Sequence, residues 1–192
     1  REPSYVLNML NLLDAELARY PDGFFADFSR KLHIYLITKF TDSYAGLASY
    51  ENPKYFELYL STSTDSTTVL HHEMMHMIDF TMQEKEGYAG FANWNSLNPP
   101  GFSYTNSNYS TNSYVYGYAP TADQVYFISG YSLKEEFEDR AEIFKVVMSN
   151  PELAKFFQLE SPLRKKLEYM IREIRRVFPS VQKTGKAEWE IL

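Results

Sequence analysis

The stretch Ser66–Glu86 most strongly limits what this chain can fold into, because it places two of the four histidines one helical turn apart. Ser, Thr and Asp residues, which favour helix N-termini, lead into it, and Gly87, a residue that commonly ends helices, follows it. The sequence therefore predicts a long helix. Its expected core face consists of Leu70, Met74 and Met77.

The two histidines of this helix are His72 and His76, with Glu73 between them. Residues four apart share one face of a helix, so both imidazoles can converge on one metal ion. Zn²⁺ accepts imidazole and lowers the pKa of a bound water, whose proton Glu73 would accept as the water attacks a carbonyl group. This is the chemistry of the H-E-x-x-H motif, which also occurs by chance, so ordinary helical histidines remain the alternative.

Composition narrows the type of metal site and the range of partners. The chain has 192 residues and no cysteine, which excludes thiolate ligands and disulfides and leaves His and carboxylates, a set that suits zinc. The net charge of −6 and the scattered basic residues argue against a nucleic-acid partner. The two basic runs, 164–166 and 172–176, are expected on a solvated helix face. No apolar run reaches membrane-spanning length.

Apolar periodicity and capping signals predict several further helices. They are expected over residues 4–20, from Ser132 (in a capping-box pattern) to about Ser149, from Asn150-Pro151 as a short helix, and from Ser161-Pro162 as the last long helix.

Runs rich in β-branched and aromatic residues predict a small sheet. Strands are expected at 31–40 and 55–61, with 44–50 pairing with the first and 55–61 at the sheet edge. The fold class is therefore α+β. We expect a single domain spanning 1–192, with an N-terminal lobe to about residue 86 and a mainly helical C-terminal lobe from about residue 87.

The third metal ligand must come from far along the chain. A metzincin would have Gly and a third His where Asp79 and Met82 stand, and no His follows His76, so that class is excluded. A carboxylate must complete the site, and the helix expected after Ser132 is rich in carboxylates. Acidic residues also favour the start of any helix, so an ordinary helix terminus is the alternative reading.

Residues 127–131 (FISGY) and 138–144 (EDRAEIF) resemble the second motif of small bacterial zinc peptidases. That group includes the anthrax lethal factor catalytic domain, the clostridial Pro-Pro endopeptidases and zinc-binding metallopeptidases of gut bacteria. Its members carry a Tyr seven residues before the zinc-binding Glu and another Glu four residues after it. The two motifs together cover roughly residues 69–80 and 127–145. Arg140 stands where members of the group usually carry an aromatic residue.

The resemblance implies a zincin-like, gluzincin-type fold, with a small twisted sheet and the active-site helix in the N-terminal lobe. It implies that Glu138 is the third zinc ligand and that Tyr131 donates a hydrogen bond to the developing oxyanion. Glu142 would orient a ligand histidine. Glu142 also remains the rival third ligand. His71 and His33 are expected to lie outside the site.

The expected function is a zinc-dependent endopeptidase acting on a protein or peptide, with Glu73 as general base. Strand 55–61 would bind an extended substrate, and the long loop 87–118 would shape its subsites. We expect a bacterial monomer, secreted or on the cell surface, with a lipid anchor on a removed N-terminus as one route to the surface. The alternative is a surface binding module that keeps zinc without general proteolysis. The Tyr/Asn/Ser-rich loop favours it, and the presence of Glu73 argues against it.

Overall fold

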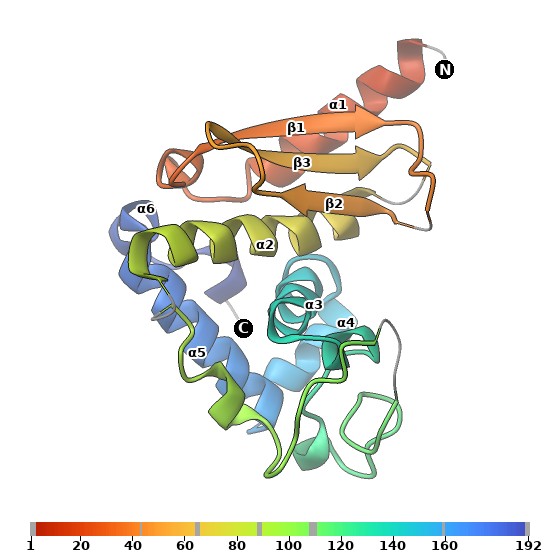
Figure 1. Ribbon diagram of the computed structural model, residues 1–192, viewed down its shortest axis with the longest axis vertical. Coiled ribbons are helices and arrows are strands. Elements are labelled where there is room, and N and C mark those ends of the chain that lie inside the picture. Colours follow the sequence, from red (N-terminus) through yellow and green to blue (C-terminus); the bar gives the residue numbers. More distant parts are fainter. Residues whose placement is uncertain are drawn as a thin grey trace.

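A computed structural model describes residues 3–42, 44–63, 66–87, 90–107, 111–158 and 160–190. These residues form a mixed α+β fold in which a small sheet lies above a mainly helical half (Figure 1). The strands are β1 (Lys31–Ile37), β2 (Gly46–Ser49) and β3 (Tyr55–Ser61). The helices are α1 (Pro3–Leu17), α2 (Ser66–Glu86), α3 (Glu136–Ser149), α4 (Pro151–Ala154), α5 (Pro162–Val177) and α6 (Pro179–Lys183).

The sheet has the order β1-β3-β2, with β3 parallel to β1 and antiparallel to β2. The prediction that 55–61 forms an edge strand was therefore wrong: β3 is central, and β2 pairs with it rather than with β1. The alternation in β3 reflects burial of one face, where Phe56, Leu58 and Leu60 are fully buried. Such alternation reports which face is covered and says nothing about how many neighbours the strand has.

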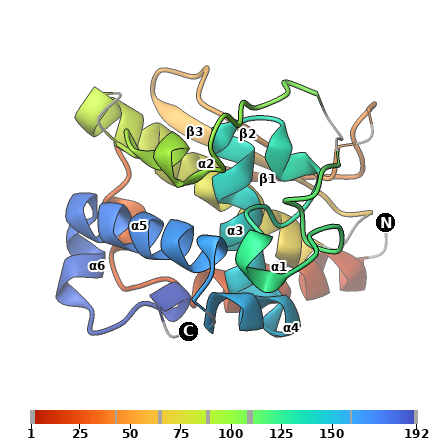
Figure 2. The same cartoon turned by 90° about the horizontal axis from the view of Figure 1, so that it is seen from below.

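Helix α2 forms the layer between the sheet and the C-terminal helices (Figure 1). Its bounds agree with the prediction, and Gly87 follows it with a φ of 62°, a left-handed conformation that suits glycine. The expected core face is fully buried, and α2 packs against β2 and β3. On its other side α2 packs against α3, which crosses beneath the sheet in the view from below (Figure 2).

The two histidines expected outside the site have structural contacts of their own. His33 stacks on Tyr55 with ring centroids 4.1 Å apart. His71 is fully buried; its Nδ1 lies 2.8 Å from the Tyr20 hydroxyl and its Nε2 lies 2.8 Å from a carboxylate oxygen of Glu16. Because Glu16 belongs to α1, His71 is more than a bystander: it ties α1 to α2.

Helix α3 begins later than the sequence indicates. A 3₁₀ turn occupies Tyr131–Leu133, and α3 starts at Glu136 with no side-chain cap. The carbonyl groups that an earlier helix would use are taken by the loop, since the Thr105 N–H donates to Leu133 O at 2.9 Å. The neighbouring Asn106 N–H likewise donates to the carbonyl oxygen of Lys134 at 2.9 Å. The capping-box prediction was therefore wrong.

One basic residue expected on a solvated face is fully buried. Lys166 donates to Asp139 Oδ2 at 2.6 Å and to the Tyr126 carbonyl oxygen at 3.0 Å. The same Asp139 oxygen accepts hydrogen bonds from Trp94 Nε1 and Tyr104 Oη, each at 3.0 Å. This network joins α5, α3 and the loop that follows α2. In sequence, Lys166 falls within the apolar stripe of α5, which was the signal for its burial.

We predict that Lys166→Met destabilises the protein, because it leaves the Asp139 carboxylate buried without a counter-charge. The free energy of unfolding should fall by about 3–5 kcal/mol, measured by urea denaturation. Adding Asp139→Asn to Lys166→Met should restore most of this loss, whereas the exposed control Lys165→Met should leave stability nearly unchanged. A double variant no more stable than Lys166→Met would contradict this account of the pair.

Candidate metal centre

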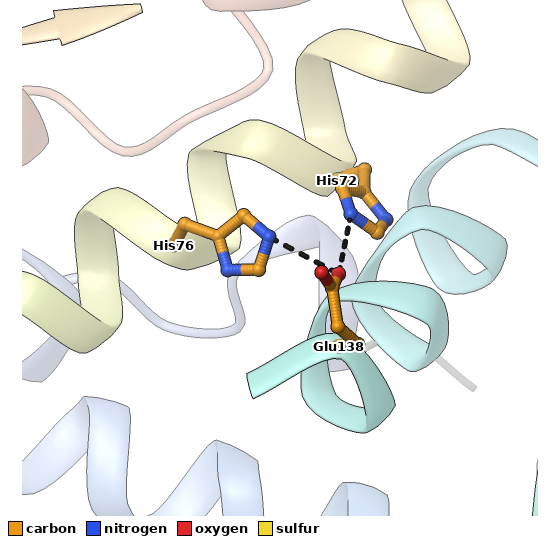
Figure 3. Close-up of side chains that lie close together, drawn as sticks. All are labelled: His72, His76 and Glu138. Carbon is orange, nitrogen blue, oxygen red and sulfur yellow. Dashed lines mark hydrogen bonds and ion pairs between the residues drawn. The ribbon is translucent and has the colours of Figure 1, made fainter. Parts of the chain in front are cut away.

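The structure brings together the three side chains that the sequence singled out as metal ligands. His72 and His76 project from one face of α2, and Glu138 points at them from α3 (Figure 3). Glu138 Oε2 lies 3.1 Å from His72 Nε2 and 3.4 Å from His76 Nε2. One ligand atom from each residue lies within 4.8 Å of the other two.

These distances suit a metal ion held between the three side chains. A tetrahedral ion with bonds of ~2.0–2.1 Å separates its donor atoms by about 3.4 Å. The two nitrogen-to-oxygen distances, 3.1 and 3.4 Å, are close to that separation. Glu138 is buried and the two histidines are half-buried, so the group is protected from bulk solvent. This His/His/Glu group can therefore bind a metal ion.

The carboxylate of Glu138 is held in the ionised form. Burial opposes ionisation of Glu138, but hydrogen bonds from His72 and His76 outweigh it and hold the pKa of Glu138 far below its usual range. Burial likewise opposes a charge on His72, yet the two carboxylates beside it raise the pKa of His72 to about 9. The cluster thus attracts positive charge, as a proton on His72 or as a cation.

Glu142 takes a supporting position. Its Oε1 lies 3.1 Å from Nδ1 of His72, on the opposite side of the ring from Glu138. Ser129 Oγ donates to Glu142 Oε2 at 2.8 Å, and Lys145 forms an ion pair with Oε1. Glu142 can therefore fix the tautomer of His72 and leave Nε2 free for a metal. The geometry favours Glu138 over Glu142 as the third ligand.

Tyr131 lies at the site because the 3₁₀ turn before α3 carries it there. Its hydroxyl donates to Glu138 Oε1 at 2.7 Å. Burial, together with the charge of Glu138, raises the pKa of Tyr131 above its ordinary value, so the hydroxyl keeps its proton at neutral pH. Lys134 Nζ lies 3.0 Å from the same carboxylate oxygen. Sequence reasoning missed Lys134, although its i,i+4 spacing from Glu138 was a signal.

Glu73 is buried and faces a cleft of about 480 Å³ that His72 and Tyr131 also line. Burial raises the pKa of Glu73, and the imidazoles of His72 and His76 partly offset this. The cleft also reaches β2, since Ala45 and Gly46 line it.

Gly46 is the second residue that sequence reasoning missed. A Cβ atom there would lie 2.5 Å from Val69 Cγ1 and 2.8 Å from Glu73 Cγ, so only glycine lets β2 approach α2 this closely. Gly46 therefore sets the distance between the strand and Glu73. Nothing in the local sequence indicates this contact, because it depends on tertiary packing.

No protein-family model, characterised protein or solved structure matches this chain. The resemblance to small zinc peptidases therefore depends on the two sequence motifs alone. None of the described helices is both long enough and apolar enough to cross a lipid bilayer.

We predict that Glu138→Ala abolishes stoichiometric metal binding. Glu142→Ala should bind metal more weakly by roughly 10–100-fold but still bind it, because it removes only an orienting contact. Metal content after equilibration with Zn²⁺, followed by competition with a chromogenic chelator, measures both effects. Glu135→Ala, which removes an exposed carboxylate one turn away, is the control. A larger loss for Glu142→Ala would make Glu142 the ligand.

Proposed function

We propose that this protein is a zinc-dependent endopeptidase with a zincin-like fold. The observation that carries the proposal is the convergence of His72, His76 and Glu138, with Glu73 of the same helix turned into the adjoining cleft. A structural metal site would be closed by a fourth protein ligand, whereas catalytic zinc sites have three protein ligands and an open position. Among the described residues, the group of potential metal ligands contains those three side chains only.

Zinc is the metal that this donor set suits best. Two imidazole nitrogens and one carboxylate oxygen match a common catalytic zinc site, and a chain without cysteine has no softer ligand to offer. When bound, zinc polarises a substrate carbonyl group and makes water a better nucleophile at neutral pH.

The residues around the cluster divide the remaining chemistry. Glu73 takes the proton of the attacking water and then gives it to the leaving amine, a role that its burial and raised pKa support. Tyr131 remains protonated and can turn from Glu138 to donate to the developing oxyanion. Lys134 stays on the Oε1 side of Glu138 and keeps that carboxylate positioned when Tyr131 moves.

An extended peptide would bind along β2 rather than along the expected strand 55–61, because β3 has partners on both sides. β2 is an edge strand, and Gly46 at its start lines the cleft with Glu73. Main-chain pairing with such an edge gives affinity for peptides of many sequences. None of the described residues of loop 87–118 lines this cleft. The cleft therefore does not support the expectation that this loop shapes the substrate subsites.

Secretion or surface display, and a monomeric state, remain part of this proposal. The alternative, a surface binding module that retains zinc, is favoured by the exposure of Tyr116 and Tyr118 in the long loop. Peptide cleavage distinguishes the two functions. The binding module would hold zinc and cleave no peptide. The enzyme would hold zinc and cleave peptides, and this turnover would need Glu73.

We predict that Glu73→Gln keeps its zinc and loses peptide hydrolysis. The substitution removes the base without removing a ligand, so kcat should fall by about 10²–10⁴-fold while metal content stays at the wild-type level. Cleavage of a mixed peptide library, followed by mass spectrometry, measures activity. If zinc-loaded wild type cleaves neither the library nor unfolded proteins, the endopeptidase proposal fails in favour of the binding module.

We also predict that Gly46→Ala lowers activity without removing zinc. The added methyl group forces β2 and Glu73 apart, which displaces the base but leaves both ligand histidines in place. The value of kcat/KM should fall by at least about tenfold, because small misplacements of a catalytic group are costly. Gly185→Ala is the control, since a Cβ atom there meets no other atom within 4 Å. Wild-type kinetics in Gly46→Ala would show that this close approach is unimportant.

A further inference from the structure

The sheet has a second open edge, on the far side from the cleft. Because β3 is central, β1 is the outer strand at the edge opposite β2 (Figure 1). Apart from its pairing with β3, the stretch 31–36 of β1 makes no backbone hydrogen bond to the described residues. An edge strand presents a row of unpaired N–H and C=O groups, which can pair with the backbone of another chain.

A pocket of about 330 Å³ opens at this edge. Four consecutive residues at the start of β1 line it: Lys31, Leu32, His33 and Ile34. Consecutive side chains of a strand point to opposite faces of the sheet, so a pocket lined by all four extends across the open edge and reaches the backbone there. Its other wall consists of Leu17, the last residue of α1, and Phe25 of the 3₁₀ turn Phe24–Ala26.

The two faces of the strand differ in chemistry at this pocket. Leu32 and Ile34 are half-buried and pack on the hydrophobic core, as do both residues of the opposite wall. Lys31 and His33 are exposed. None of the described residues that line the pocket is acidic, and Lys31 forms no ion pair with a described residue. The pocket therefore offers an apolar wall on one face and uncompensated basic groups on the other.

This alternation selects the kind of strand that fits beside β1. In an added strand, every second side chain would face Leu32 and Ile34, and the side chains between them would lie beside Lys31 and His33. Apolar pairs and pairs of opposite charge stabilise neighbouring strands, whereas like charges destabilise them. The matching strand therefore alternates apolar and acidic residues. A second copy of β1 does not match, because the sequence 31–37 (KLHIYLI) contains no acidic residue.

We propose that the open edge of β1 binds an extended segment of another protein in which apolar and acidic residues alternate. Main-chain pairing with β1 provides affinity, and the pocket selects the side chains. The apolar side chains enter the pocket between α1 and β1, and the acidic ones lie beside Lys31 and His33. This inference does not depend on peptidase activity, because no residue of the pocket lines the cleft or belongs to the candidate metal centre.

Three blocked, fluorescein-labelled pentapeptides test the proposal: one alternates Val with Glu, one alternates Val with Lys, and one alternates Ser with Glu. Each is titrated with the full chain, and fluorescence anisotropy measures binding. We expect saturable binding of the Val/Glu peptide. The Val/Lys peptide meets like charges and the Ser/Glu peptide leaves the apolar wall uncovered, so both should bind at least about tenfold more weakly. Absence of saturable binding by the Val/Glu peptide, or equal binding of all three, would overturn the proposal.

NMR of the ¹⁵N-labelled full chain locates the peptide. The backbone amides of Leu32 and Ile34 should shift saturably with the Val/Glu peptide, while Ala48 of β2 reports separately on the edge beside the cleft. Shifts at Ala48 without shifts in β1 would place the peptide at the other edge and refute the inference. Shifts of the β1 amides with protein concentration alone would mean that a second copy covers the edge, which would also refute it.

A charge reversal tests the selection of acidic residues. Lys31→Glu should weaken binding of the Val/Glu peptide by about fivefold or more and make the Val/Lys peptide the tighter ligand. The matched control is Lys39→Glu, since Lys39 is equally exposed but lies beyond the end of β1 and outside the pocket; it should stay within about twofold of wild type. Equal effects of the two variants would show a general charge effect, and the proposal would fail. If Lys31→Glu does not fold, the wild-type comparison of the three peptides decides.

Discussion

Buried charges must be neutralised, and α3 carries several of them into the interior at once. Glu138 meets the two histidines of α2, Asp139 meets a lysine of α5, and Arg140 meets an aspartate of α2. Because neighbouring residues point in different directions around a helix, these pairs fix both the rotation of α3 and its position along α2. Any displacement of α3 would leave at least one ion uncompensated at a cost of several kcal/mol. The geometry of the candidate metal centre is set by the same requirement that holds the helices together.

Much of the candidate site could be predicted from the sequence, because its strongest signals come from residues that are close together in the chain. The spacing of His72 and His76 within one predicted helix fixes their shared face before any tertiary structure is known. Glu138 could be predicted as the third ligand only from the resemblance to small zinc peptidases, since nothing local distinguishes it from other acidic residues at the start of a helix. Gly46 and Lys134 were missed for different reasons: the first acts through packing between a strand and a helix, and the second resembles an ordinary surface lysine.

The fold was predictable to the extent that it depends on periodicity. The bounds of α2 and the N-termini of α4 and α5 follow from apolar spacing and caps, which are properties of neighbouring residues. The predicted strand order was wrong because strand pairing is decided between segments distant in the chain. The alternation of polar and apolar residues within one strand does not indicate which strands it pairs with. The predicted start of α3 was wrong because the N–H group of loop residue Thr105 takes the carbonyl oxygen of Leu133, which an earlier helix would have used. Lys166 was placed on the surface by its charge, although its position in the apolar stripe indicated the interior.

The strand order β1-β3-β2 has a consequence for how the chain folds. The two strands made first, β1 and β2, do not touch each other in the sheet, and each finds its partner only when β3 arrives between them. The parallel β1–β3 pairing closes a long loop, which is slow because the loop entropy is lost before the contacts form. During synthesis the chain therefore stays without a sheet until residue 61 has emerged, and the metal-site helix follows directly behind. Sheet formation and docking of α2 are thus expected to occur as one cooperative event.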